Sequence, residues 1–307
     1  MKGIINKMWV VIVLMVVFMF VVMCSKFERD PVLQCILKKE GMSFWMPRYN
    51  ETSGELFFLV KDHNSYEEES IEDGIEYGEL CKIIYPDTTT VYRVISYPIC
   101  EYDLSHDGKK IVFRDTSGEV FLYDISKDSL SFLDIEGWGI KFSYSGDGVF
   151  FYSGNFLFYK EFSGTLYQVG EVEHKEDISI GPGDSLIALG NKIYSLLWEV
   201  GPKLGKLLCT IRSSGGSIVA FNPQYEGWIA VFSPFTFTMK YLKIKNIFST
   251  DSLVIDVRPY EYSWFHETSI TWKDGDAIIF ACCDTEGGDP LHPTYLELWV
   301  RENIKLK

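Results

Sequence analysis

Short apolar runs, separated by polar turns that contain glycine, recur along the chain at intervals near forty residues. In the clearest unit, Leu104 to Phe113, a strand end and a polar turn lead into a new apolar strand. Related segments begin 38 residues later at Phe142 and a further 38 residues on at Ile180. Looser copies occupy 221–231, 270–280 and, early in the chain, 45–58. Self-similarity with this period indicates a repeat architecture built from small modules.

Two further strand-like runs follow each turn. The first of them alternates between apolar and polar residues, at 120–124, 156–160, 193–197, 238–244 and 295–300. The second is shorter, at 91–95, 129–133, 166–169, 207–211 and 252–256. Four short strands per repeat are typical of a propeller blade. The sequence therefore predicts an all-β fold, a six-bladed β-propeller of four-stranded antiparallel blades.

The last repeat is one strand short, because only the polar tail 301–307 follows its third strand. The apolar segment Val32 to Leu37 precedes the first complete repeat. We expect it to supply the outer strand of the last blade, which closes the ring and leaves no long unpaired edge. A single domain then covers residues 31–307.

Aromatic residues are abundant, with 22 Phe, 18 Tyr and 8 Trp in 307 residues. Several of them recur at equivalent positions of the repeats, where they are expected to pack between neighbouring blades: Tyr92, Phe121, Phe132, Phe142, Phe150 and Phe158. This packing explains most of them without any sugar ligand.

The turn Ser105-His106-Asp107-Gly108 and the strand that follows it, to Phe113, resemble the Ser-Pro-Asp-Gly-x-x-Ile-x-Phe signature of TolB-like, WD-like (WD40-like) propeller repeats. His106 and Tyr144 replace the proline of that signature, whereas Pro182 and Pro223 retain it. The resemblance covers four of the six repeats. It implies an extracytoplasmic propeller that recruits other proteins, often in cell-envelope assemblies.

The N-terminus does not fit the repeat pattern. Lys2 and Lys7 precede an apolar run from Met8 to Met23 that ends at Cys24, which is the plan of a signal peptide. Residues 1–24 are predicted to be a signal peptide or membrane anchor, and 25–30 a linker. The segment Val21-Val22-Met23-Cys24 resembles a lipoprotein lipobox, which makes Cys24 the expected lipid attachment site, although Met23 departs from the small residue usual there.

Two other fates of the N-terminus stay open, an uncleaved anchor and plain secretion. The 17 residues from Met8 to Cys24 are at the short limit for spanning a bilayer as a helix. With positive charge at the start of the chain, the rest is expected to be translocated. The prediction is an extracytoplasmic protein tethered to a membrane, in the periplasm or at the cell surface.

The charge balance argues against nucleic acid as a partner. The net charge is −14, and loss of Lys2 and Lys7 with a leader would make it −16. An acidic chain without a cluster of Lys and Arg repels polyanions.

Metal and redox motifs are not found in the sequence. The seven cysteines form no CxxC pair, and their pairing cannot be deduced from their spacing. Adjacent Cys282 and Cys283 are either a vicinal redox pair or thiols of an apolar strand. The five histidines are scattered and are expected at turns or on the surface: His63, His106, His174, His266 and His292. We expect no metal and no cofactor.

Two loops interrupt the repeats. The first, 62–79, is acidic, and it is a calcium loop, a partner-docking segment or simply a solvated connection. The second, 284–290, carries Gly-Gly and Asp-Pro turn units and is expected to connect two strands. If both lie on one rim of the ring, they would flank each other at the closing seam.

Two classes of function remain. The first is a non-catalytic scaffold that binds a protein or peptide partner on one face of the ring. The second is a propeller hydrolase or lyase acting on a glycan or peptide at the central channel. No nucleophile elbow, zinc-protease motif or phosphate-binding loop occurs, which favours the scaffold. Inward-facing carboxylates with a His or Tyr at the channel mouth would favour the enzyme.

Overall fold

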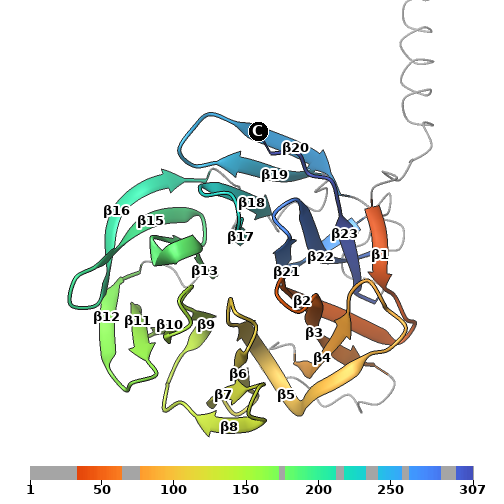
Figure 1. Ribbon diagram of the computed structural model, residues 1–307, viewed down its shortest axis with the longest axis horizontal. Helices are drawn as coiled ribbons and strands as arrows, with labels where there is room; N and C mark the ends of the chain where they lie inside the picture. The colour runs from red at the N-terminus through yellow and green to blue at the C-terminus, as the bar shows by residue number, and fades with distance from the viewer. Residues whose placement is uncertain are drawn as a thin grey trace, which may run out of the picture.

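The computed structural model describes residues 33–63, 77–172, 177–211, 218–232, 241–257, 263–284 and 295–306. Within these ranges the chain forms 23 strands and one short 3-10 turn, η1 (Pro182–Asp184). The strands form antiparallel sheets that are arranged in a ring around a common centre, which is the architecture of a β-propeller (Figure 1). The prediction of an all-β propeller with antiparallel four-stranded blades is confirmed in this respect.

Four sheets have four strands each. Their orders are β1-β23-β22-β21, β12-β11-β10-β9, β13-β14-β15-β16 and β17-β18-β19-β20. The strands of the first two are β1 Leu33–Leu37, β21 Ser263–Lys273, β22 Ala277–Asp284, β23 Glu297–Arg301, β9 Trp138–Phe142, β10 Gly148–Ser153, β11 Phe156–Glu161 and β12 Leu166–Glu171. Those of the other two are β13 Ile178–Ile180, β14 Leu186–Leu189, β15 Lys192–Trp198, β16 Pro202–Thr210, β17 Ile218–Phe221, β18 Trp228–Phe232, β19 Tyr241–Asn246 and β20 Ser252–Asp256.

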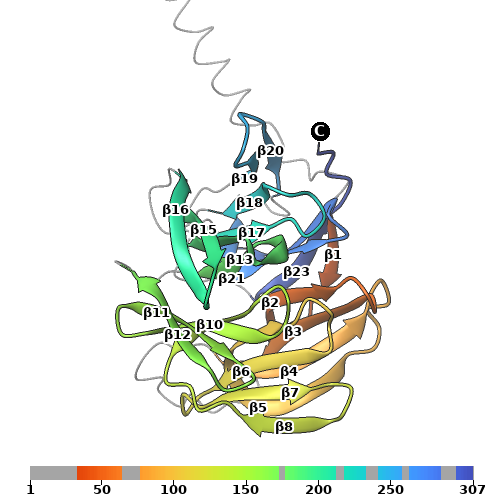
Figure 2. The same cartoon turned by 60° about the vertical axis from the view of Figure 1, so that its left-hand side comes forward.

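The predicted number of six blades is wrong, because the structure has four four-stranded blades. The first two repeats do not form separate blades but one continuous seven-stranded sheet, in the order β2 to β8. Figure 2 shows these strands together in the lower part of the view. They are β2 Met42–Asn50, β3 Glu55–Asp62, β4 Gly78–Ile84, β5 Tyr92–Leu104, β6 Lys110–Asp115, β7 Val120–Asp124 and β8 Ser129–Phe132.

Strand β5 is the physical reason for the merged sheet. The sequence predicted a short strand at 91–95 and a new repeat after it, but β5 continues for 13 residues. Its first part pairs with β4, with Tyr92 opposite Lys82, and its second part pairs with β6, with Leu104 opposite Ile111. No glycine interrupts the segment 96–99, and Pro98 favours an extended residue before it. The chain therefore passes from one partner strand to the next without a turn.

The expected closure of the ring is present. Strand β1 pairs antiparallel with β23, Leu33 lying opposite Arg301 and Leu37 opposite Leu298. Leu33, Ile36 and Leu37 are buried. The first and last described strands thus share one blade, as expected for the segment 32–37.

The core lies between the sheets. The described residues form five clusters of buried hydrophobic side chains, and each cluster joins residues of two neighbouring sheets. The largest packs the seven-stranded sheet, for example Phe58 and Leu80, against Ile279 and Leu298 of the closing blade. Of the six aromatics predicted to pack between blades, Phe142 and Phe150 are buried and Phe121 and Phe158 half-buried in these clusters, whereas Tyr92 and Phe132 are exposed.

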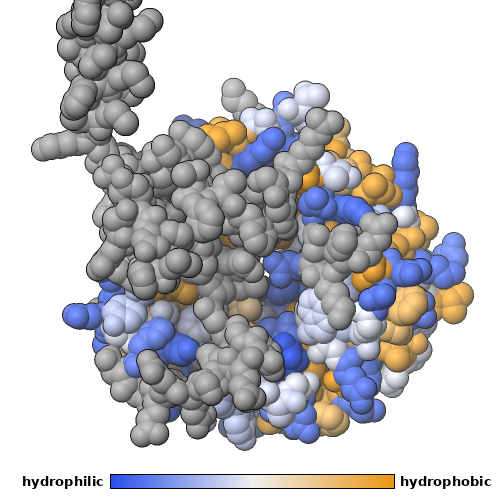
Figure 3. All heavy atoms as spheres, turned by 180° about the vertical axis from the view of Figure 1, so that it is seen from behind, coloured by the Kyte–Doolittle hydropathy of each residue, from blue (hydrophilic) through white to orange (hydrophobic). Residues whose placement is uncertain are grey.

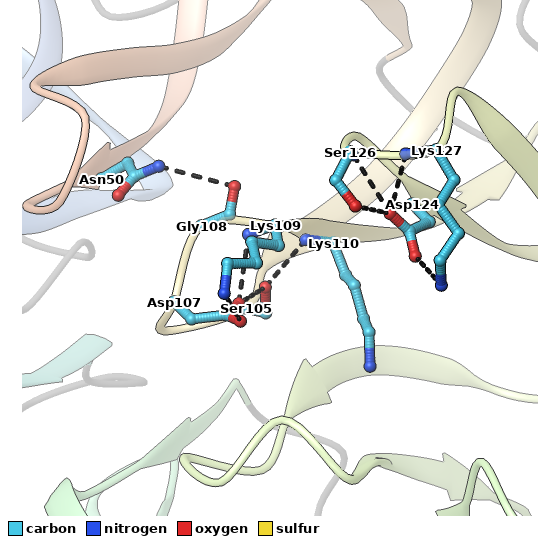
Figure 4. A network of polar contacts seen from close by, with 9 residues as sticks. All are labelled: Asn50, Ser105, Asp107, Gly108, Lys109, Lys110, Asp124, Ser126 and Lys127. Atoms are coloured by element: carbon cyan, nitrogen blue, oxygen red, sulfur yellow. Dashed lines mark hydrogen bonds and ion pairs between the residues drawn. The ribbon is translucent and has the colours of Figure 1, made fainter.

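The repeated turns are held by local hydrogen bonds, which Figure 4 shows for the turn that begins at Ser105. The Ser105 hydroxyl accepts from Lys110 N at 2.9 Å and donates to Asp107 Oδ1 at 2.8 Å. Gly108 has φ +69° and donates from its N to Ser105 O. Across the turn, Asn50 Nδ2 points at Gly108 O at 3.5 Å, which links the first repeat to the second.

The predictions about the N-terminus fall outside the described residues. They concern the signal peptide or anchor at 1–24, the linker at 25–30 and lipid attachment at Cys24. In the described part of the chain, no helix has the length and apolar character needed to cross a membrane.

Strand β1 is expected to be essential for stability. Deleting residues 33–37 uncovers the outer edge of β23 and removes three buried side chains, each of which stabilises by roughly 1.5–3 kcal/mol. That loss is comparable with the whole stability of a typical domain, so we expect unfolding or aggregation, measured by circular dichroism and light scattering. The matched control deletes residues 26–30. Equal melting temperatures for the two deletion proteins would show that the closure is dispensable.

Alanine substitutions at two turn glycines distinguish the cost of backbone strain from the cost of crowding a contact between repeats. Gly108→Ala and Gly146→Ala both place alanine at positive φ, +69° and +75°, which costs about 1–2 kcal/mol. At Gly108 the new Cβ would also lie 1.8 Å from Asn50 Nδ2, whereas at Gly146 nothing lies within 4 Å. We expect Gly108→Ala to lower the free energy of unfolding by about 1–3 kcal/mol more than Gly146→Ala does, because that is the usual cost of overpacking. Urea unfolding measures the difference. Equal losses would refute the contact.

Candidate functional site

A cavity of about 250 Å³ lies at the centre of the ring. It is lined by residues of six strands, β2, β5, β9, β13, β17 and β21, and of the turns that follow some of them. These strands surround the middle of the ring in Figure 1. Because each is the first strand of a repeat, the repeat architecture brings residues far apart in sequence to one place.

The turn at the end of each of the first five of these strands contributes one residue at an equivalent position to the wall. These residues are Glu51, His106, Tyr144, Pro182 and Pro223. They include both positions at which this chain replaces the proline of the repeat signature. The cavity is therefore surrounded on one side by equivalent positions that carry five side chains of four different types.

His106 and Tyr144 form an aromatic pair in this ring. Their ring centroids are 4.0 Å apart at an interplanar angle of 27°, a stacked arrangement. His106 is exposed and Tyr144 is half-buried. The Tyr144 backbone N donates to the buried Asp184 carboxylate, which fixes the turn, and Ser145 N donates to the other oxygen at 2.9 Å. The pair thus presents a flat surface held on a rigid turn.

Glu51 is the acidic member of the ring. Its Oε1 is buried and has no hydrogen-bond partner among the described residues. Burial raises the pKa of the Glu51 carboxyl, a hydrogen bond from Gln224 partly offsets this, and the nearby Asp274 raises it again. Glu51 Oε1 is therefore both shielded from solvent and without a hydrogen bond from a described group.

Deeper in the cavity, β5 supplies two carboxylates that join it to β9. Glu101 accepts from Arg114 Nε at 2.6 Å and from Gly139 N at 2.9 Å. Asp103 accepts from Arg48 Nε at 2.9 Å and from Phe142 N at 3.0 Å. Both carboxylates accept charge-assisted hydrogen bonds, which are stronger than neutral ones. They hold the seven-stranded sheet to the β9–β12 blade.

Lys141 of β9 is the second cation of this wall. Its side chain is 20% exposed, and its ion pair with Asp103 Oδ1 is long, at 3.8 Å. Burial lowers the pKa of the Lys141 ammonium, and the positive charge of Arg48 lowers it further. Asp103, Asp177 and Glu101 act in the opposite direction and favour the charged form.

The other side of the cavity is apolar. Strand β17 contributes Val219 and Phe221, and β21 contributes Ile270 and Trp272, all of them nearly buried. The Trp272 indole N donates to Ala220 O at 2.9 Å, which fixes the ring between the two strands. The cavity thus has one charged wall, from β2, β5, β9 and the start of β13, and one apolar wall.

Of the candidate residues that the sequence analysis named, His106 and Tyr144 lie together at this cavity. The other histidines, the cysteine pair and the two loops do not line it in the described part of the chain. His63, at the end of β3, is exposed, with its Nε2 2.8 Å from the Ser43 hydroxyl. His174 and His292, and the side chain of His266, lie outside the described residues, as do most of the loops 62–79 and 284–290. Cys282 is buried in β22, whereas the Cys283 side chain is not described.

Sequence reasoning missed Arg48, Glu51, Glu101, Asp103 and Lys141. One available signal was Glu101 and Asp103 at alternate positions beside the apolar residues of β5, which places both on one side of a strand. A group of three or more potential metal ligands is not found in the described ranges.

Comparison with known proteins supports the fold and nothing finer. No protein-family model matches the chain, and no curated protein matches it. Among solved structures, the WD40 repeats of RRP9 superpose with a TM-score of 0.54 at 9% identity over 88% of this chain and 97% of that one. The structure of U3-55K superposes with a TM-score of 0.53 at 8% identity, over 88% of this chain and 98% of that one. Membership of the TolB-like family is not confirmed, and at such low identity the likeness establishes that the chain is a β-propeller.

Proposed function

We propose that this chain is a non-catalytic scaffold that binds a protein or peptide partner at the mouth of the central cavity. The observation that carries the proposal is the set of five turn residues around the cavity. Equivalent positions of a repeat need only make the same turn, yet here they carry Glu51, His106, Tyr144 and two prolines. This gives an asymmetric surface on a rigid frame, the kind of site that recognises one partner in one orientation.

The chemistry of these side chains suits a protein partner. Accessible aromatic rings supply much of the binding energy of protein interfaces, because they bury a large area and lose little conformational freedom. The His106–Tyr144 stack provides such rings. The acidic net charge of −14 disfavours nucleic acid as the partner.

We place this scaffold outside the cytoplasm, tethered to a membrane through Cys24 or an uncleaved N-terminal helix, at the cell envelope. The proposal rests on the order of basic residues, apolar run and cysteine in residues 1–24. Tethering would hold the cavity close to partners in the same membrane.

An enzyme of the hydrolase or lyase class is the second candidate. Glu101 and Asp103 face the cavity and His106 and Tyr144 lie at its edge, which is the arrangement expected for that class. Each of these carboxylates already accepts from an arginine and a backbone N–H, so both act as structural acceptors. Glu51, whose pKa is raised by burial, is the remaining candidate for a general acid.

Removing the aromatic pair is expected to abolish partner capture. The full-length chain is used as bait in detergent-solubilised membranes, and captured proteins are quantified by mass spectrometry. His106→Ala/Tyr144→Ala should lower capture about tenfold or more, because such rings are frequent energetic hot spots. The control is Tyr92→Ala/Tyr97→Ala, which removes two exposed rings of β5. Equal capture by both double variants would place the interface elsewhere, and turnover of a glycan or peptide that Glu51→Gln abolishes would assign an enzyme.

Substitution of Cys24 tests the tether. If Cys24 carries acyl chains, Cys24→Ser should lose metabolic acyl labelling. The variant should also leave the membrane fraction, because the acyl chains are then what anchors the protein. Cys35→Ser, which changes an exposed cysteine of β1, is the matched control and should keep both label and membrane association. Unchanged membrane association with no label in any form would identify an uncleaved anchor.

A further inference from the structure

Two cations of the charged wall compete for one oxygen. Arg48 Nε lies 2.9 Å from Asp103 Oδ1, and Lys141 Nζ lies 3.8 Å from the same atom. The other oxygen of Asp103 accepts from Phe142 N. At these distances Asp103 is hydrogen-bonded to Arg48 and not to Lys141, which has no hydrogen bond shorter than 3.5 Å to any described residue.

The neighbouring carboxylates do not supply Lys141 with the missing hydrogen-bond acceptors. Glu101 is occupied by Arg114 and by the N–H groups of Gly139 and Ile140. Asp177 acts on Lys141 electrostatically and favours its charged form. A lysine ammonium has three donors, and a cation with so little exposure is stabilised by acceptors. Lys141 thus faces the cavity with unused donors.

The charge of this wall favours a ligand with a single negative charge. Arg48 and Lys141 line the cavity together with Glu101, Asp103 and Asp177, and Arg114 is paired with Glu101, so a dianion such as phosphate meets three carboxylates nearby. A monocarboxylate adds a single charge and can accept from both Lys141 and Arg48. The facing wall of Val219, Phe221, Ile270 and Trp272 favours an apolar group on the same ligand.

We propose that the central cavity binds the C-terminal carboxylate of a peptide whose last residue is apolar. The carboxylate lies between Lys141 and Arg48, and the last side chain lies against the wall formed by β17 and β21. A terminal residue carries both groups on one carbon and enters a cavity of about 250 Å³ as a single residue. An internal acidic residue would require two chain segments to enter. This inference rests on the proposed scaffold function and specifies what the scaffold recognises.

Lowering of the Lys141 pKa by burial and by Arg48 agrees with this assignment. A bound carboxylate stabilises the ammonium form and raises that pKa. Binding should therefore be strongest below the lowered pKa of Lys141 and weaken as the pH rises through it, because the neutral amine no longer attracts the anion.

The test uses isothermal titration of the full-length chain in detergent with three tetrapeptides. The first is acetyl-Gly-Ser-Ala-Val with a free C-terminus, the second is its C-terminal amide, and the third is acetyl-Gly-Ser-Glu-Val amide, which carries an internal acid. We expect the free acid to bind at least about tenfold more tightly than either amide, a difference equivalent to one well-made charged contact.

Substitution of Lys141 completes the test. Lys141→Met should remove the preference for the free acid and leave amide binding unchanged, and Lys141→Arg should restore most of it. Lys206→Met, on the outer strand β16, is the matched control and should behave like the wild type. Thermal unfolding of each variant checks that the fold is retained.

Three results would overturn the proposal. They are equal binding of free acid and amide, equally tight binding of the internal-acid peptide, and absence of binding by all three peptides. Partner capture that depends on His106 and Tyr144 but not on Lys141 would leave the scaffold function intact and refute the carboxylate site alone.

Discussion

Mutual burial of sheet faces is the constraint on which this structure depends. Each sheet of the ring is apolar on both faces, as β10 shows with five consecutive buried residues. Both faces of every sheet are covered only when the ring is complete, so a break in the ring would expose the faces on either side of it. Pairing of β1 with β23 makes that completion possible, because it supplies the last blade with its fourth strand.

The inner wall of the ring is lined by side chains of the first strand of each repeat. It divides into a charged half and an apolar half, and the apolar residues Val219, Phe221, Ile270 and Trp272 also belong to the buried clusters between sheets. The charged half is not simply solvated, because Glu101 and Asp103 accept backbone N–H groups of β9 and thereby align the seven-stranded sheet with its neighbour. The same residues thus support the fold and shape the cavity.

Much of the architecture was predictable, and the number of blades was not. The 38-residue spacing of the turns located the strands around Ser105 and Ser143, and the closing strand followed from the missing fourth strand of the last repeat. The merger of two repeats escaped prediction because it depends on the 13-residue strand β5, whose two halves pair with different strands. Alternation along a single segment does not tell which strands it will pair with.

The sequence by itself determined the class of fold, the turns and the apolar positions, because these follow from local periodicity and from glycine at fixed places. It did not determine the site. Arg48, Glu101 and Lys141 belong to three strands separated by about forty residues or more, and only the pairing and packing of whole sheets brings their side chains to one cavity. The long distance from Lys141 to its carboxylate partner depends on how the strands are placed relative to one another, and that placement arises only when the ring closes.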